Sequence, residues 1–372
     1  MFTFIFFRKA LAAVLLLTAL PIISYGQTDS LKTLFKIKGF LDTYYAYDFN
    51  RPDDHIRQPF LYNHNRHNEF NVNLAMLQAT FTQKGVRVNL GLMAGTYAQD
   101  NYADEENLLK NIFEANVGVA LNKRRSLWLD AGIFPSHIGF ESAISIQNPT
   151  LTRSLLAENS PYFLSGAKLS WDISEAWSLS ALVTNGWQRI ARPFGNQVPG
   201  MGTQLHYHPH KGLALNWSTF AGSEAHDSLN QTRLFNNLYL ELKPTQNLQL
   251  IYGFDIGSQR SRTHPQGSIQ QNNWHVWYTP VIIGRVAISE RLFVAARAEY
   301  YDDPDGVIIS YGAPAGFETF GISANFDFYI QKNTMFRIEA RSFRSNEPLF
   351  AVDGGYKESN TFVTGSLAIS FP

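Results

Sequence analysis

Apolar and polar side chains alternate with a period of two residues through most of this chain. In the stretch MFRIEARSF, Arg337, Glu339 and Arg341 recur at every second position, and the alternate positions are Phe336, Ile338 and Ala340. Successive side chains of a β-strand point to opposite faces, so this spacing predicts a strand with one charged and one apolar face. The apolar face must be covered by a protein core or by lipid.

The same parity recurs in other segments. LFVAARAEYY sets Val294 against Arg297 and Glu299, and FEANVGVAL sets Phe113 against Glu114. In each segment one face is almost entirely apolar, whereas the other face mixes charged, amide and glycine positions. The segments run for about 10 residues or more, which is the length that a transmembrane strand needs.

Short and long connections alternate between these segments. The short ones are rich in turn-forming residues, and we find them at 84–85, 122–126, 172–176, 208–212, 243–247, 288–291 and 331–334. The long ones are polar and fall at 50–67, 98–111, 135–162, 187–199, 222–232, 258–272, 302–315 and 345–360. This alternation is typical of an up-and-down membrane barrel, with turns on the periplasmic side and loops outside. We predict an all-β fold, an antiparallel transmembrane β-barrel of about 16 strands.

A soluble β-sandwich would also show alternation, with its apolar face turned inward. Its strands average roughly 5 to 6 residues, about half the length found here. Aromatic residues also cluster at segment ends, as in the interfacial girdles of membrane barrels, with Trp171 and Trp177 flanking one turn. The last segment places its apolar residues on one parity and ends on an outward Phe371. These features favour the membrane barrel, which closes its edges and leaves no backbone group unpaired in lipid.

The N-terminus predicts a secretory signal. Arg8 and Lys9 precede an apolar run from Ala10 to Ile23, and Gly26 is a small residue at the expected cleavage position. The run is short for a membrane-spanning helix. We therefore expect residues 1–26 to be a cleaved signal peptide and residues 27–372 to form the barrel.

Composition excludes several classes of function. Lys plus Arg is 31 and Asp plus Glu is 31, so no nucleic-acid partner is expected. Cysteine is absent, which excludes thiol catalysis and disulfides.

His206, His208 and His210 recur with period two, but Pro209 interrupts the strand there, and we predict no metal site and no cofactor. No Gly-x-Ser-x-Gly nucleophile elbow occurs, so we predict that the chain is not an enzyme.

Two stretches resemble a known family. They are GFLDTYYAYDF (39–49) and the segment 132–171, and the resembling features of the second are Gly139-Phe140-Glu141, Asn148, Arg153-Ser154, Pro161-Tyr162 and Gly166. In these features the chain resembles the outer-membrane β-barrel porins of the OmpL-like family. The resemblance implies a pore for small solutes in the cell outer membrane, and it does not identify the solute.

The connection 135–162 is the longest, and connections longer than about 12 to 15 residues are usually functional. Its apolar pieces, AISI and LTRSLL, are unsuited to a mobile tip in water. We predict that it folds into the barrel and narrows the passage, with Glu141, Arg153 and Glu158 near the constriction.

A second set of charges is expected on one stretch of lumen wall. Neighbouring strands lie about 4.8 Å apart, so these groups can pair across strands. Basic groups slightly outnumber acidic ones if Lys36 is included, which predicts a mild preference for anions. The expected pore-lining residues are Arg285, Arg297, Glu299, Asp327, Arg337, Glu339 and Arg341.

The function that we predict is passive diffusion of small polar solutes through a water-filled porin. A first alternative is a substrate-specific channel, with Trp277, Phe293 and Tyr301 as an aromatic track for sugars or other organic solutes. A less favoured alternative is a barrel enzyme with a catalytic pair at the outer rim. The expected partners are membrane lipid, small polar solutes, the assembly machinery at the C-terminal strand that ends at Phe371, and a homo-oligomer.

Overall fold

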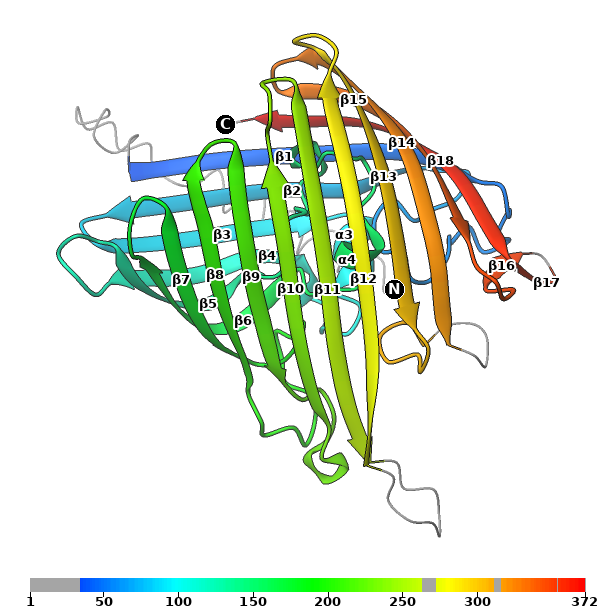
Figure 1. Ribbon diagram of the computed structural model, residues 1–372. Coiled ribbons are helices and arrows are strands. Elements are labelled where there is room, and N and C mark those ends of the chain that lie inside the picture. Colours follow the sequence, from blue (N-terminus) through cyan, green and yellow to red (C-terminus); the bar gives the residue numbers. More distant parts are fainter. Residues whose placement is uncertain (1–33, 263–271, 311–315, 353, 372) are drawn as a thin grey trace, which may run out of the picture.

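A computed structural model describes residues 34–262, 272–310, 316–352 and 354–371. Sixteen antiparallel strands form one closed barrel, in which each strand pairs with its neighbours in sequence and β18 pairs with β1 (Figure 1). The register at the closure pairs Gly39 with Phe371 and Asp48 with Phe362. The predicted fold and strand number are confirmed. The predicted signal peptide, residues 1–26, lies outside the described residues.

The strands differ in length, and those from β10 to β15 are mostly longer than those from β3 to β7. The barrel strands are β1 (Phe35–Asp48), β2 (Phe70–Gln83), β3 (Val86–Ala94), β4 (Ile112–Ala120), β5 (Leu127–Pro135), β6 (Phe163–Asp172), β7 (Trp177–Thr184), β8 (Gly200–His210), β9 (Leu213–Gly222), β10 (Thr232–Leu242), β11 (Leu248–Arg262), β12 (Asn272–Ala287), β13 (Leu292–Asp303), β14 (Phe317–Gln331), β15 (Thr334–Arg344) and β18 (Ser359–Phe371).

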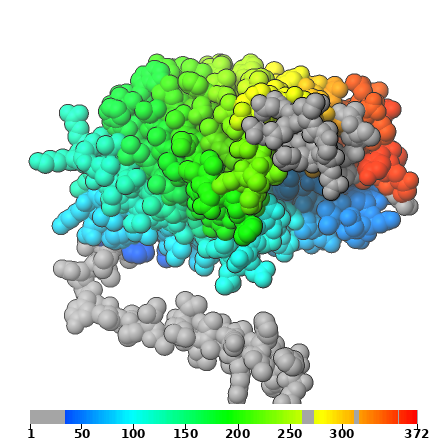
Figure 2. All heavy atoms as spheres, turned by 90° about the horizontal axis from the view of Figure 1, so that it is seen from below, coloured from blue at the N-terminus to red at the C-terminus, as the bar shows by residue number. Residues whose placement is uncertain are grey.

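Short turns gather at one end of the barrel and long connections at the other, as the alternation in the sequence predicts. All seven expected short links join consecutive strands, from β2–β3 to β14–β15. Seen from the long-connection end, the colours follow the sequence once around the rim, as an up-and-down barrel requires (Figure 2). The last long connection adds a small hairpin of β16 (Phe350–Val352) and β17 (Gly355–Lys357).

Apolar and polar side chains lie on opposite faces of the strands, as predicted. On β15 the side chains of Phe336 and Ile338 point outward and are about 40% exposed, whereas Arg337 and Glu339 point inward and are 0% exposed. A barrel with an apolar outer face and a polar inner face suits a lipid surround.

Phe113 is an exception to this pattern. The register between β3 and β4 shifts between Gly91 and Leu92, so that Gly91 pairs with Glu114 and Leu92 with Ile112. A β-bulge of this kind re-aims a side chain. Phe113 therefore packs against an interior aromatic cluster and not on the outer face where simple parity had placed it.

Helices are few and short among the residues that the structure describes. They are α3 (Thr96–Asn101), α4 (Leu155–Glu158) and the 3-10 turns η1 (Leu109–Asn111), η2 (Ser145–Gln147) and η3 (Asp227–Leu229). Among the described residues, no helix has the length and apolar character needed to cross a membrane.

Candidate functional site

The connection between β5 and β6 lies inside the barrel. Ser218 Oγ on β9 donates a 2.6 Å hydrogen bond to the carbonyl oxygen of His137, and Gly139 N donates to Asn237 Oδ1 on β10 at 3.1 Å. The connection thus crosses the inner faces of β9 and β10 soon after it leaves β5. The prediction that residues 135–162 fold inward is confirmed, and we call residues 136–162 the inner loop.

The helix α4 holds the inner loop against β11, β12 and β13. Ser154 caps its N-terminus by accepting a hydrogen bond from Ala157 N, which satisfies a backbone donor that the short helix leaves unpaired. Leu155 and Leu156 are buried against the wall. Gly253 on β11 leaves room for the inner loop, because a β-carbon at this position would lie 2.8 Å from Phe140 Cε1 and 3.3 Å from Leu156 Cδ1. Local capping and apolar burial together fix this part of the inner loop.

The wall of β12 to β15 carries a ladder of buried ion pairs. Opposite charges alternate along and across the strands, so each carboxylate faces at least one guanidinium. The pairs are Arg297 Nη2–Glu339 Oε1 at 2.8 Å, Arg297 Nε–Glu299 Oε1 at 3.2 Å, Arg341 Nη2–Glu299 Oε1 at 2.6 Å, Arg337 Nε–Asp327 Oδ1 at 2.7 Å and Arg285 Nη2–Asp327 Oδ2 at 3.0 Å.

The same charges bind the backbone of the inner loop. Guanidinium groups donate to loop carbonyls, and carboxylates accept from loop N–H groups. The wall thus supplies hydrogen-bond partners for the backbone of a segment that has little secondary structure of its own. The bonds are Arg337 Nη1 to Ser145 O at 2.6 Å, Arg341 Nη1 to Arg153 O at 2.8 Å, Thr152 N to Glu339 Oε2 at 2.6 Å and Leu155 N to Glu299 Oε2 at 2.7 Å.

This arrangement corrects the expectation of an open, charged lumen wall. The wall residues face the interior, but Arg337, Glu339 and Arg341 are at most 1% exposed. The physical reason is that a ladder of mixed sign neutralises itself and retains donors and acceptors that match an unpaired loop backbone. The members that bond to the inner loop therefore lie beneath it, whereas Arg285 is only partly buried, with 17% of its side chain exposed.

A second buried contact ties the inner loop to the first long connection and to the barrel seam. Asp42 on β1 accepts from Ser145 Oγ at 2.7 Å and from Ser366 Oγ on β18, and His64 Nε2 lies 2.9 Å from its Oδ2. All four side chains are buried. Both serines donate to Asp42 and not to His64, so the histidine is not placed to activate either serine as a nucleophile.

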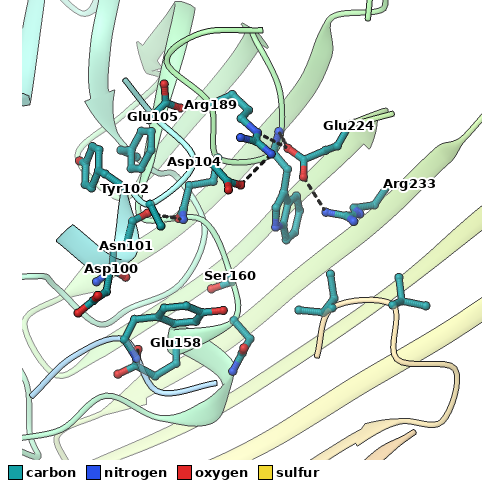
Figure 3. A pocket seen from close by; sticks show the side chains of 18 residues that line it. Asp100, Asn101, Tyr102, Asp104, Glu105, Glu158, Ser160, Arg189, Glu224 and Arg233 are labelled. Atoms are coloured by element: carbon teal, nitrogen blue, oxygen red, sulfur yellow. Dashed lines mark hydrogen bonds and ion pairs between the residues drawn. The ribbon is translucent and has the colours of Figure 1, made fainter. Parts of the chain in front are cut away.

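An outer cavity of about 450 Å³ opens at the long-connection end. Five carboxylates and two guanidiniums line it, and they come from four connections and from β10 (Figure 3). Arg189 Nη2 lies 2.8 Å from Asp104 Oδ2, and both Arg189 and Arg233 lie within 4 Å of Glu224. Of the remaining carboxylates, Asp100 pairs with Arg66 at 2.9 Å, whereas Glu105 and Glu158 accept from backbone N–H groups. Carboxylates still outnumber guanidiniums, so the cavity is acidic. The charged residues are Asp100, Asp104, Glu105, Glu158, Glu224, Arg189 and Arg233.

An inner cavity of about 380 Å³ lies on the other side of the inner loop. The loop forms one side of it, and Gln78 of β2 and Glu114 of β4 form the other. Tyr102 and Ser160 line both cavities. The two cavities are therefore neighbours that share part of their wall.

The three residues predicted at the constriction divide between these cavities. Glu141 and Arg153 line the inner cavity, and Glu158 lines the outer one. Glu158 accepts from Tyr62 N at 2.9 Å, and Glu141 accepts from Ser154 N at 3.2 Å. Burial raises the pKa of both carboxyl groups and lowers the pKa of Arg153 to about 10.

The aromatic track proposed from the sequence does not form. Trp277 and Tyr301 are buried in a cluster with Phe60 and Phe317, where ring packs on ring. Phe293 lies near the short turns and packs against Tyr329. An apolar side chain inside a barrel can fill the interior as well as line a passage, and parity does not distinguish these two roles.

Sequence reasoning missed the acidic lining of the outer cavity. Its members lie in separate long connections whose mutual approach has no local signal, although Asp100, Asp104 and Glu105 do stand close together in the chain.

No group of three or more potential metal ligands occurs in the part of the chain that the structure describes. The rings of His206 and His208 stack at 4.9 Å beside a short turn.

Comparison with known proteins places this geometry in a family. The family model described as "beta-barrel porin-2, OmpL-like" matches residues 34–371. A search of curated protein sequences finds no significant match.

Solved structures with a similar fold are outer-membrane channels and proteins. An anion-selective porin from Comamonas acidovorans has a TM-score of 0.58 at 10% identity, over 91% of this chain and 99% of that one. The outer-membrane channel DcaP of Acinetobacter baumannii has a TM-score of 0.58 at 11% identity, over 91% and 97%. The trimer form of the outer-membrane protein OmpT of Vibrio cholerae has a TM-score of 0.56 at 8% identity, over 91% and 99%. At such identities the likeness establishes the fold alone.

Proposed function

The chain belongs to the OmpL-like beta-barrel porin-2 family, and from this premise we propose a route for solutes through its barrel. It is an outer-membrane porin that forms a channel for passive diffusion of small polar solutes. The proposed route runs from the outer cavity to the inner cavity, between the inner loop and the wall formed by β2 to β7.

One observation carries this proposal: the two cavities share Tyr102 and Ser160 as lining residues. On the opposite side of the barrel the inner loop is bonded to the charged wall, so the proposed route does not pass between them. In a porin, selectivity follows from the width of the passage and the charges that line it. Glu141, Arg153 and Glu158 are accordingly proposed as the charged residues of the constriction.

The charges along this route reverse the selectivity expected from the sequence. The lining of the outer cavity has five carboxylates against two guanidiniums, with a third guanidinium, that of Arg66, paired to Asp100. The lining of the inner cavity has two carboxylates against one guanidinium. Clefts lined by one sign of charge concentrate ions of the opposite sign. We therefore propose a mild preference for cations over anions among small inorganic ions.

A cysteine at Ser160 tests the route, because the chain has no native cysteine. Modification of Ser160→Cys by a bulky methanethiosulfonate reagent should lower single-channel conductance in a planar bilayer. The control is Lys123→Cys, which lies in an exposed short turn. If mass spectrometry shows complete modification at position 160 and conductance is unchanged, solutes take another route.

Several finer statements belong to the same proposal. The mature barrel comprises residues 27–372, the short turns face the periplasm, and the strand ending at Phe371 contacts the assembly machinery. A homo-oligomer is also proposed, which the similarity in fold to a protein solved in a trimer form supports. Cross-linking in native membranes tests the oligomer, and N-terminal sequencing of the purified protein tests cleavage after Gly26.

A substrate-specific channel is the second candidate. The observation that favours it is the aromatic lining of the inner cavity, which includes Tyr97, Phe113 and Tyr162. A general porin gives solute flux that rises linearly with concentration, whereas a specific channel gives flux that saturates. Liposome-swelling rates measured over a concentration series separate the two. The family and the fold are those of a channel, and we propose that the chain has no enzymatic activity.

A further inference from the structure

Arg153 has donors that the protein leaves unused. Arg153 is 4% exposed, and its Nη2 donates to Ala157 O at 2.7 Å. Within the described part of the chain, its Nε and Nη1 have no hydrogen-bond acceptor, and no carboxylate lies within ion-pairing distance. The other buried arginines of the lumen, such as Arg297 and Arg337, each have a carboxylate partner. Arg153 is therefore a buried guanidinium that retains the capacity to bind an anion.

The unused donors belong to a residue that lines the inner cavity. The guanidinium lies over the ring of Tyr162, which fixes its plane. Tyr162 in turn contacts Tyr97 edge to face, with ring centroids 5.4 Å apart. A planar, always charged group held in this way is suited to donate a charge-assisted hydrogen bond to a carboxylate.

Negative groups lie on the same cavity. Glu141 accepts hydrogen bonds from Ser154 N and Oγ. Glu114 accepts from Gln78 Nε2 at 2.6 Å and from Asn116 Nδ2 at 2.8 Å. An ionised carboxylate offers about four acceptor positions, so both groups can also accept from a cationic solute. With the acidic outer cavity in front of them, a solute that carries only negative charge meets repulsion before it reaches Arg153.

These observations point to a solute with both signs of charge. We propose that the inner cavity is a binding site for a small zwitterion of the amino-acid type with an apolar or aromatic side group. Arg153 binds its carboxylate, Glu141 and Glu114 attract its ammonium group, and Tyr97, Phe113 and Tyr162 contact its side group. A volume of about 380 Å³ lies within the roughly 300 to 1,000 Å³ typical of small-molecule sites. The inference rests on the proposed route and names the class of solute that the route favours.

Three probes of similar size separate the two charges. L-phenylalanine carries both groups, 3-phenylpropanoate carries the carboxylate alone, and phenethylamine carries the ammonium group alone. Each probe is added to wild-type channels in a planar bilayer, and the concentration that gives half of the maximal reduction in ionic conductance is measured. We expect phenylalanine to act at a concentration at least about tenfold lower than either single-charge analogue, because it gains both charge-assisted contacts.

Two variants assign the contacts. Arg153→Gln should weaken the effect of phenylalanine at least about tenfold and leave phenethylamine unchanged or stronger. Glu141→Gln should weaken phenylalanine and leave 3-phenylpropanoate unchanged or stronger. Arg189→Gln is the matched control, since it removes a positive charge from the outer cavity and not from the inner one. Heat-modifiable migration on gels verifies that each barrel is folded.

The outcomes separate this inference from the proposed route. Equal potency of phenylalanine and its two analogues on the wild-type channel overturns the zwitterion site, even if neither variant folds. An equal loss in Arg153→Gln and Arg189→Gln overturns the role of Arg153. Conductance that is insensitive to all three probes leaves the route in place and removes the site. A wild-type channel with no conductance contradicts the route itself.

Discussion

Arg337 and Asp327 face each other across β14 and β15, with Arg337 Nε 2.7 Å from Asp327 Oδ1 and both side chains 0% exposed. The remaining donors of Arg337 bind the carbonyl oxygens of Ser145 and Asn148 in the inner loop. A residue on the barrel wall is thus the anchor for a segment nearly 200 positions away in sequence. The wall and the loop form one polar unit within the lumen.

Reversing the charge of this anchor should damage the fold. In an open lumen, Arg337→Glu would leave folding intact and only shift ion selectivity. In the packed arrangement it places a second carboxylate beside Asp327, and breaking a buried pair costs about 3 to 5 kcal/mol. We expect poor assembly or a marked loss in the free energy of unfolding, measured by urea titration of the refolded barrel. Normal stability of Arg337→Glu would show that the wall is open to water.

The neighbouring position tests the outer face. Ile338 is 40% exposed on the lipid side of β15, and an arginine near the bilayer midplane costs about 2 to 4 kcal/mol. Ile338→Arg should therefore reduce the yield of heat-modifiable barrel in membranes, whereas Ile338→Leu should assemble normally. Normal assembly of the arginine variant would invert the assignment of the two faces.

Binding of a cationic group at the inner cavity should weaken in acid. Burial raises the pKa of Glu141, although Arg153 and Arg297 act in the opposite direction, and Glu114 lies on the far side of the cavity. A raised pKa means that Glu141 takes up a proton, and loses its charge, at a higher pH than an ordinary glutamate at about 4.3. The effect of phenethylamine on conductance should decline as pH falls from 7 toward this value.

Glu141→Gln provides the reference for that titration. It lacks the Glu141 carboxyl group, so its response to phenethylamine should be weaker at pH 7 and should decline less over the same range. A decline of equal size in wild type and Glu141→Gln would assign the pH dependence to another group.

The comparison of sequence and structure shows which features are local. Parity predicted the face of Arg337 correctly because side-chain direction in a strand depends on immediate neighbours. The apolar character of AISI and LTRSLL predicted that the inner loop would be buried. The contacts of Arg337 could not be predicted, because the path of a long loop brings Ser145 and Asn148 to it. Phe113 was assigned to the wrong face because a bulge leaves no clear mark in the sequence.

The candidate site was less accessible to sequence reasoning. Glu141, Arg153 and Glu158 were identified as one group because they lie in one loop. The structure divides them, since α4 and the turn after it separate the inner cavity from the outer one. Arg189, Glu224 and Asp104 come from three different connections, and their approach follows from closure of the barrel and not from any local pattern.

Single-channel conductance of the wild type and of a variant lacking residues 143–156 tests the central claim most directly. The account holds that this chain is a passive channel whose passage is narrowed by the inner loop. Wild-type protein in planar bilayers should show open channels with a nearly linear current–voltage relation. The deletion should raise conductance several-fold, because it removes the segment bonded to Arg337 and Arg341. Wild-type protein that never conducts, or a folded deletion variant with unchanged conductance, would contradict the account.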